Sequence, residues 1–318
     1  MSNTAASYDA VSIDRQLCRT ASRPFHDAAA RRERTVAAMR GWIEANLPRF
    51  FPAPAGRPTA PTAAAAGLAR TLFLIVHPGS AAHGTPVDIW ARRMANRVFA
   101  RLAEAAPHDE GGLPDAMSIA NDPITPAAFI ALAAATGRTY PGRDALMAHI
   151  DPAGPKQGPA AHVARALLGA PAQELDLWMR MDESIEQMAA GRGQNVCRTA
   201  AEDLCDATLC LTRFGTRRGQ IPTATKSAIF AMAGRLASEY LRSGDCESAA
   251  HLLLSQAWAH EAPPDFDTMH ELIARVSRIG CVPGLRIPND GAPAECDFPW
   301  APSLAVFRAV ILSAPAAR

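Results

Sequence analysis

Apolar residues recur three and four positions apart along most of this sequence, which is the spacing of one face of an α-helix. The first clear stripe consists of Val36, Met39, Ile43 and Leu47. Pro48 follows it, and a proline inside a helix removes a hydrogen bond and clashes with the preceding turn. We therefore predict a helix from about residue 26 to residue 47.

The same spacing predicts further helices, whereas hardly any stretch alternates apolar and polar residues as a half-buried strand does. The expected helices span residues 61–77, 86–102, 126–136, 143–150, 160–168, 172–188, 197–214, 222–242, 245–259, 266–279 and 302–313. Proline and glycine separate many of them. The sequence thus predicts an all-α fold.

The connections between these helices are mostly short, which favours antiparallel neighbours packed as helical hairpins. No motif repeats at a fixed period, so a regular array of helical repeats is not expected. Two arrangements stay open, an irregular helical solenoid and a closed ring of the α/α-toroid type. The length of 318 residues suits one large domain or two small ones. We predict an N-terminal arm over residues 1–24 and a single helical domain over 25–318.

The charge of the chain is balanced, with 32 basic and 31 acidic residues, so no basic excess indicates a nucleic-acid partner. The apolar run from Leu72 to Val76 is far shorter than the roughly 20 residues of a membrane span. The first twenty residues lack the apolar region of a secretory signal. None of the seven cysteines falls in a C-x-x-C pair, and free thiols indicate a reducing compartment. We expect a cytoplasmic protein without a membrane partner, metal or cofactor.

Histidines and acidic residues gather between His260 and His270, with Glu261, Asp265 and Asp267 between them. These side chains have the donor atoms of a metal site, and Asp267 and His270 are three apart on the expected helix. The alternative is that Asp265 or Asp267 caps the helix beginning near Phe266, and we favour that interpretation.

Three other groups have weaker chemical patterns. Asp182, Glu183 and Glu186 resemble an acidic motif for Mg²⁺-diphosphate chemistry, but we favour the alternative of a solvated helix face. Ser80 lies between His77 and His83, without the strand and turn of a serine nucleophile. Lys226 and Ser227 lack the glycines of a phosphate-binding loop.

Arg213, Arg217 and Arg218 follow the helix over residues 197–214, with Gly215 among them. A glycine just past a helix end and basic residues near it are typical of C-terminal capping. The alternative is a binding site for a carboxylate or another anion.

Three short stretches resemble an uncharacterised, largely actinobacterial family of all-helical proteins, whose members lie near genes for natural-product biosynthesis. Residues 209–215, Leu-Cys-Leu-Thr-Arg-Phe-Gly, are similar to the family's Phe-Tyr-Leu-Thr-Asp-Phe-Gly. Residues 245–247 with 252–253 are similar to an acidic pair that leads into Glu-Leu-Leu. Residues 300–304, Trp-Ala-Pro-Ser-Leu, take the place of Tyr-His-Thr-Thr-Leu.

This chain differs from the family at polar positions of those stretches. Arg213 replaces the family's Asp, Asp206 replaces a His, Ala301 replaces the C-terminal His, and His251 stands where the Glu is expected. The resemblance implies that such residues line a pocket. Asp206 and Arg213 are two helical turns apart and could share a face.

We carry two hypotheses for function. The first is an enzyme of secondary metabolism that acts on a peptide or small metabolite in a central pocket. Its candidate catalytic residues are Asp206, Arg213, Glu247 and His251, and its candidate substrate-binding residues are Trp300 and Arg217. The second is a non-catalytic helical adaptor that binds a partner protein or peptide along a groove.

Overall fold

The fold consists of helices joined by turns in every part of the chain that the computed structural model describes. Those parts are residues 8–51, 62–105, 122–139, 142–150, 159–170, 174–191, 194–214, 216–217, 221–260, 264–283 and 298–313. Of residues 8–27, 105, 159 and 194–197 the backbone alone is described. These segments contain no strand, which confirms the all-α prediction.

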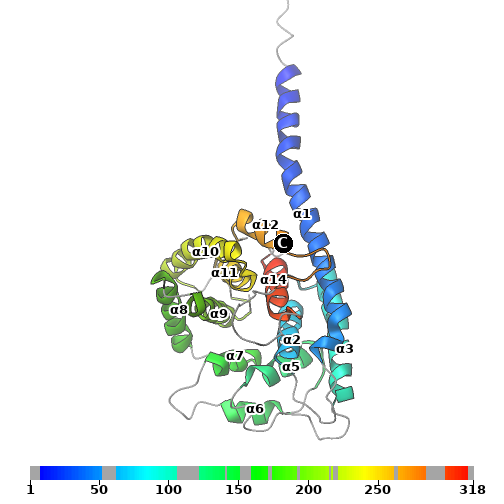
Figure 1. Ribbon diagram of the computed structural model, residues 1–318, viewed down its shortest axis with the longest axis vertical. Coiled ribbons are helices and arrows are strands. Elements are labelled where there is room, and N and C mark those ends of the chain that lie inside the picture. Colours follow the sequence, from blue (N-terminus) through cyan, green and yellow to red (C-terminus); the bar gives the residue numbers. More distant parts are fainter. Residues whose placement is uncertain are drawn as a thin grey trace, which may run out of the picture.

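The described residues form twelve helices, which Figure 1 shows in chain order. They are α1 (Tyr8–Phe50), α2 (Ala63–Val76), α3 (Pro86–Ala105), α5 (Ile124–Ala135), α6 (Arg143–Ile150), α7 (Pro159–Leu167), α8 (Glu174–Ala189), α9 (Gln194–Leu211), α10 (Thr223–Ser243), α11 (Cys246–His260), α12 (Phe266–Ala274) and α14 (Trp300–Leu312). None of them is long and apolar enough to cross a membrane.

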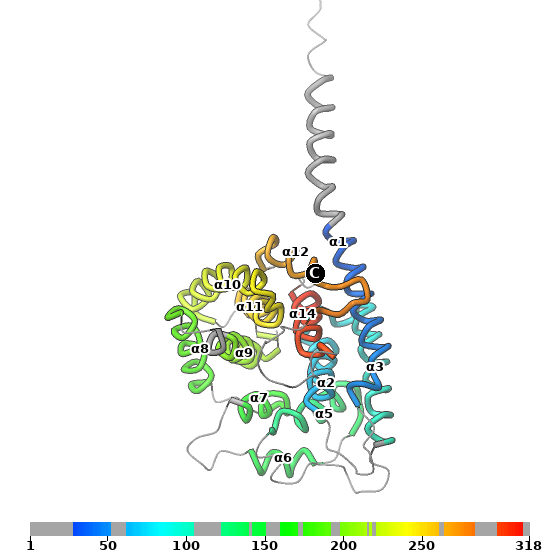
Figure 2. Tube along the Cα trace, viewed as in Figure 1, coloured from blue at the N-terminus to red at the C-terminus, as the bar shows by residue number. Residues whose placement is uncertain are grey.

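Six helices contact one another in an order that closes on itself. α2 contacts α5, α5 contacts α7, α7 contacts α9, α9 contacts α11, α11 contacts α14, and α14 contacts α2 again. The closing contact joins helices that begin at Ala63 and Trp300, far apart in the sequence. Figure 2 shows the red α14 beside the blue-cyan α2. We call these six helices the circuit.

The other helices pack against the circuit from outside. α3 contacts α2, α8 contacts α9, α10 contacts α11, and α6 contacts both α5 and α7. α1 and α12 contact each other and α14. This placement explains the composition of the circuit helices, because a helix with neighbours on all sides has little room for polar side chains. Nearly every residue of α2, α5, α11 and α14 is buried.

Several predicted helix boundaries were wrong. α1 begins at Tyr8, far before the predicted start near residue 26. α1 continues to Phe50, so Pro48 lies in its last turn and does not end it. The helix predicted over residues 266–279 ends at Ala274, and turns follow. Gly280 lies in these turns with φ +88°, and a Cβ atom there would come within 2.0 Å of the Ala38 carbonyl oxygen on α1. The chain after α12 therefore approaches the backbone of α1 closely, at a position where no side chain fits.

Candidate functional site

Two of the most apolar helices in the circuit each carry a single charged residue. Arg70 is the charged side chain of α2, and Arg308 is that of α14. A charge inside a buried helix needs a partner or a polar cavity, because desolvating it without one is costly. Both arginines face ionisable side chains of α9 and α11, and we call this group the polar cluster. Its members are Arg70, Glu202, Asp206, Glu247, His251 and Arg308.

Arg70 and Asp206 form a hydrogen-bonded ion pair between α2 and α9. Burial on its own would lower the pKa of Arg70, but the Asp206 carboxylate outweighs it and raises that pKa above the ordinary value. Arg70 therefore stays charged inside the protein. It also fixes the position of the Arg70 guanidinium relative to the rest of the polar cluster.

Glu247 and His251 lie one turn apart on α11 and so share a helix face. A terminal nitrogen of Arg308 lies 3.4 Å from Nε2 of His251. Burial, followed by the charges of Arg308 and Arg70, lowers the pKa of His251 well below its ordinary value. His251 is therefore a neutral imidazole at physiological pH, and its Nε2 accepts from Arg308.

Glu247 is the one residue between Cys246 and Ala259 that is not buried. Burial within the partly covered site and the neighbouring Glu202 charge raise its pKa to about 6, although Arg308 acts in the opposite direction. Glu202 lies at the exposed rim of the polar cluster, and there partial burial and Asp206 raise its pKa as well. Near neutral pH, Glu247 can both release and take up a proton.

Arg308 has hydrogen-bonding capacity that the described residues leave unused. Its buried Nε has no hydrogen-bond partner among them. Burial and the positive charge of Arg70 lower its pKa. Arg70 and Arg308 thus place two guanidinium groups near each other, and the Nε of Arg308 still has a proton to donate. A bound carboxylate or phosphate would stabilise this arrangement.

Cys205 is buried next to the polar cluster, and its environment decides its chemistry. Burial and the Asp206 charge raise its pKa to about 12, so the thiol stays protonated. A protonated buried thiol is a poor nucleophile. The polar cluster is therefore suited to proton transfer and anion binding, and covalent catalysis through this cysteine is not favoured.

The structure brings together three of the six site residues predicted from the sequence, namely Asp206, Glu247 and His251. It adds Arg70, Glu202 and Arg308, which sequence reasoning missed. The sequence did contain a signal for each arginine. A single charged residue within an otherwise apolar helix indicates that its side chain has a buried partner or belongs to a site.

Arg213 and Arg217 do not join the polar cluster. Both side chains are exposed in the turns after α9, and Arg213 and Phe214 have left-handed backbone conformations, with φ of 47° and 54°. The amide of Phe214 donates to the Leu209 carbonyl at 2.8 Å, so this segment ends the helix. Gly215 and Arg218, which entered the capping and anion-site interpretations, lie outside the described residues.

Trp300 packs against α2 at the start of α14. It is the first residue of α14, and a Cβ atom on Gly67 of α2 would come within 2.9 Å of its ring. Arg308 lies about two helical turns farther along α14. Trp300 therefore holds α14 against α2, which helps to position Arg308 opposite Arg70.

The side chains between His260 and His270 are engaged separately, which supports the capping interpretation. Asp265 accepts from the amide of Thr268 at 2.9 Å as the N-cap of α12. His260 lies 2.6 Å from the Lys226 carbonyl, and His270 lies 2.9 Å from Arg31. Glu261 lies outside the described residues. Within the described segments no group of three or more potential ligands could hold a metal ion.

The remaining candidate patterns serve local structure. Asp182, Glu183 and Glu186 are exposed on α8, as expected for a solvated face. Ser80 accepts from the Ala82 amide and His77 accepts from the Gly79 amide, each at 3.1 Å, so these two side chains stabilise turns.

Comparison with models of known protein families, with curated proteins and with solved structures found no match in any of the three searches.

Proposed function

We propose that this protein is an enzyme that acts on a peptide or small metabolite bearing an anionic group, with its active site at the polar cluster. One observation carries the proposal: six ionisable side chains from four circuit helices converge where apolar packing would otherwise be expected. Perturbed pKa values combined with convergent geometry are characteristic of functional sites.

The residues divide into two roles. Arg308, with an unpartnered Nε, and Arg70 hold the anionic group of the substrate. Glu247 exchanges the proton, because its pKa of about 6 lies close to working pH. Neutral His251 orients Arg308 by accepting its hydrogen bond at Nε2. Asp206 is a positioning residue, since it acts on the substrate only through Arg70.

The circuit supplies the rigid frame of such a site. The return of contacts from α14 to α2 favours the toroid alternative over the open solenoid, and we include a ring-like arrangement in the proposal. Substrate would enter from the side where Glu202 is exposed. The resemblance to the actinobacterial family supports a cytoplasmic role in natural-product biosynthesis.

The adaptor hypothesis is supported by a different observation. Leu175 and Met179 lie one turn apart on α8, and 73% and 62% of their side chains are exposed. An exposed apolar pair of this kind suits a partner protein. Two side chains make a small patch, however, so we place the adaptor second.

Metabolite comparison tests the enzyme proposal. Cells lacking the gene should accumulate a compound that purified wild-type protein consumes in an extract of those cells. Glu247→Gln should lower that rate by about 100-fold, in the range of general acid–base catalysis. The matched control is Glu239→Gln, the same change at an exposed position of α10, which should keep the wild-type rate.

Two results would contradict the proposal. One is an unchanged metabolite profile in cells without the gene, together with a partner protein that binds wild type but not Leu175→Ser/Met179→Ser. The other is consumption of the compound by Glu247→Gln at the wild-type rate.

A further inference from the structure

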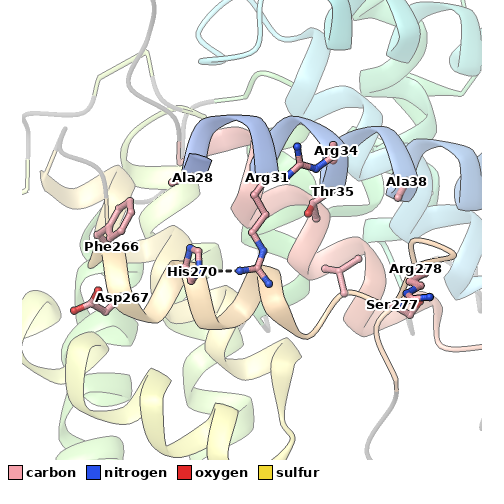
Figure 3. Close-up of a pocket in the computed structure, with 11 residues that line it drawn as sticks. Ala28, Arg31, Arg34, Thr35, Ala38, Phe266, Asp267, His270, Ser277 and Arg278 are labelled. Atoms are coloured by element: carbon pink, nitrogen blue, oxygen red, sulfur yellow. Dashed lines mark hydrogen bonds between the residues drawn. The ribbon is translucent and has the colours of Figure 1, made fainter. Parts of the chain in front are cut away.

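A groove separates α1 from α12 and the turns after it, and none of its lining residues belongs to the polar cluster. Its volume is about 850 Å³, which is within the usual range of small-molecule sites. Figure 3 shows Arg31 extending from α1 across to His270 on α12, with Phe266 at one end and Arg278 at the other.

The lining of this groove is rich in cationic donors. Arg31, Arg34 and Arg278 line it, and none of the three has a carboxylate partner among the described residues. Asp267 is the one acidic residue of the lining. The guanidinium of Arg31 lies 2.9 Å from Nε2 of His270. The groove thus has a net positive charge and is complementary to an anion.

An apolar pocket of about 230 Å³ adjoins the groove. Met269, Ile273 and Val310 line it, and it shares Phe266 and His270 with the groove. Arg32 also lines this pocket, and its guanidinium donates to the Val310 carbonyl at the end of α14. The combined site offers a cationic region for a head group and an apolar region next to it.

We infer that this combined site binds an amphiphilic anion. The carboxylate or phosphate head lies among Arg31, Arg34 and Arg278, and the apolar part enters the pocket formed by Met269, Ile273 and Val310. The cationic groove or the apolar pocket alone would be an ordinary surface feature. Because the two share lining residues, one ligand with a charged head and an apolar part can fill both. The inference does not depend on the enzyme proposal, because the two sites have no residue in common.

Calorimetric titration of the full-length protein tests this inference. Sodium octanoate and octyl phosphate are the probes, and octan-1-ol, acetate and inorganic phosphate supply the chain or the head alone. We expect one or both amphiphiles to bind at least about tenfold more tightly than every single-feature probe, because charge-assisted hydrogen bonds and apolar burial then act together. The tighter of the two amphiphiles identifies the head group.

Charge removal locates the site. Arg31→Gln/Arg34→Gln should weaken binding of the better amphiphile by at least about tenfold, since the head loses two charge-assisted partners. The matched control, Arg93→Gln/Arg97→Gln, removes two exposed arginines one turn apart on α3 and should leave the affinity unchanged. Ala28→Phe, which fills the junction of groove and pocket, should also weaken binding.

Three results would overturn the inference. Octan-1-ol could bind as tightly as the charged probes, which would show that charge is not recognised. The α3 control could lose as much affinity as the α1 variant, which would show a general charge effect. The third result is that neither amphiphile binds at millimolar concentration, which would show that the site does not take this class of ligand.

Discussion

A buried guanidinium changes what the side chains around it can do. Arg308 holds His251 in the neutral form and offsets part of the repulsion between Glu247 and Glu202. Arg70 remains charged because Asp206 compensates it. The protonation of each member of the polar cluster therefore depends on the others, and a substitution at one position changes the pKa of its neighbours.

Glu247 gives the polar cluster a measurable effect on stability. Its pKa is about 6 in the folded protein, against an ordinary value of 4.5. The folded state binds this proton more tightly than the unfolded chain, so the stabilisation is complete below about pH 4.5 and is lost as the pH rises through 6. Over that interval it amounts to about 2 kcal/mol. In Glu247→Gln the side chain is neutral at every pH, so the variant does not lose this stability as the pH rises.

We therefore predict that Glu247→Gln gains up to about 2 kcal/mol of unfolding free energy relative to wild type between pH 4.5 and pH 7. Urea denaturation at pH 4.5, 5.5 and 7 measures this difference. Glu239→Gln serves again as the surface control. A difference between Glu247→Gln and wild type that stays constant across these pH values would contradict the assigned pKa.

Among the elements, α1 and the turns after α12 approach each other closely. Gly280 and Gly244 both have left-handed backbones, with φ of +88° and +86°. They differ in their surroundings, because a Cβ on Gly244 would meet no atom within 4 Å, whereas one on Gly280 would overlap the Ala38 carbonyl. An alanine at position 244 would therefore introduce backbone strain alone, whereas an alanine at position 280 would add steric overlap to the strain.

We predict that Gly244→Ala lowers the free energy of unfolding by about 1 kcal/mol, from strain alone. Gly280→Ala should lower the free energy of unfolding by about 2 kcal/mol more than Gly244→Ala does, because α1 must shift to make room for the methyl group. Chemical denaturation of both variants measures the difference. Equal losses would show that α1 and this turn do not approach so closely.

The elements also show how much the sequence could predict. Apolar spacing located most helices because each must bury one face, whatever it packs against. It failed at the end of α12, where Val276 and Ile279 continue the spacing but Ile279 is 70% exposed. Asp206, Glu247 and His251 were found through a family resemblance. Arg70 was missed because its partner is 136 residues away, beyond the reach of any local pattern.

At the scale of the whole molecule, one continuous apolar core runs through the circuit and its outer helices. It includes Trp42 of α1 and Trp258 of α11, on different parts of the fold. α14 contacts both of these helices. The prediction of a single domain over residues 25–318 requires that the two regions unfold together.

Single-tryptophan chains would report on this cooperativity. One variant keeps only Trp42 and the other only Trp258, with phenylalanine at the remaining tryptophans. We predict the same urea midpoint from the fluorescence of both, because α14 couples their surroundings. A circular dichroism curve for each variant controls for the substitutions. Two separate midpoints would show that the chain contains two independent cores.

The contact between α2 and α14 has a consequence for how the chain is made. A ribosome adds roughly 5–20 residues per second, so α2 is synthesised at least about ten seconds before residues 300–312. During that interval the apolar face of α2 lacks the helix α14 that covers it in the finished protein. Nascent chains of this protein should therefore be good substrates for ribosome-associated chaperones.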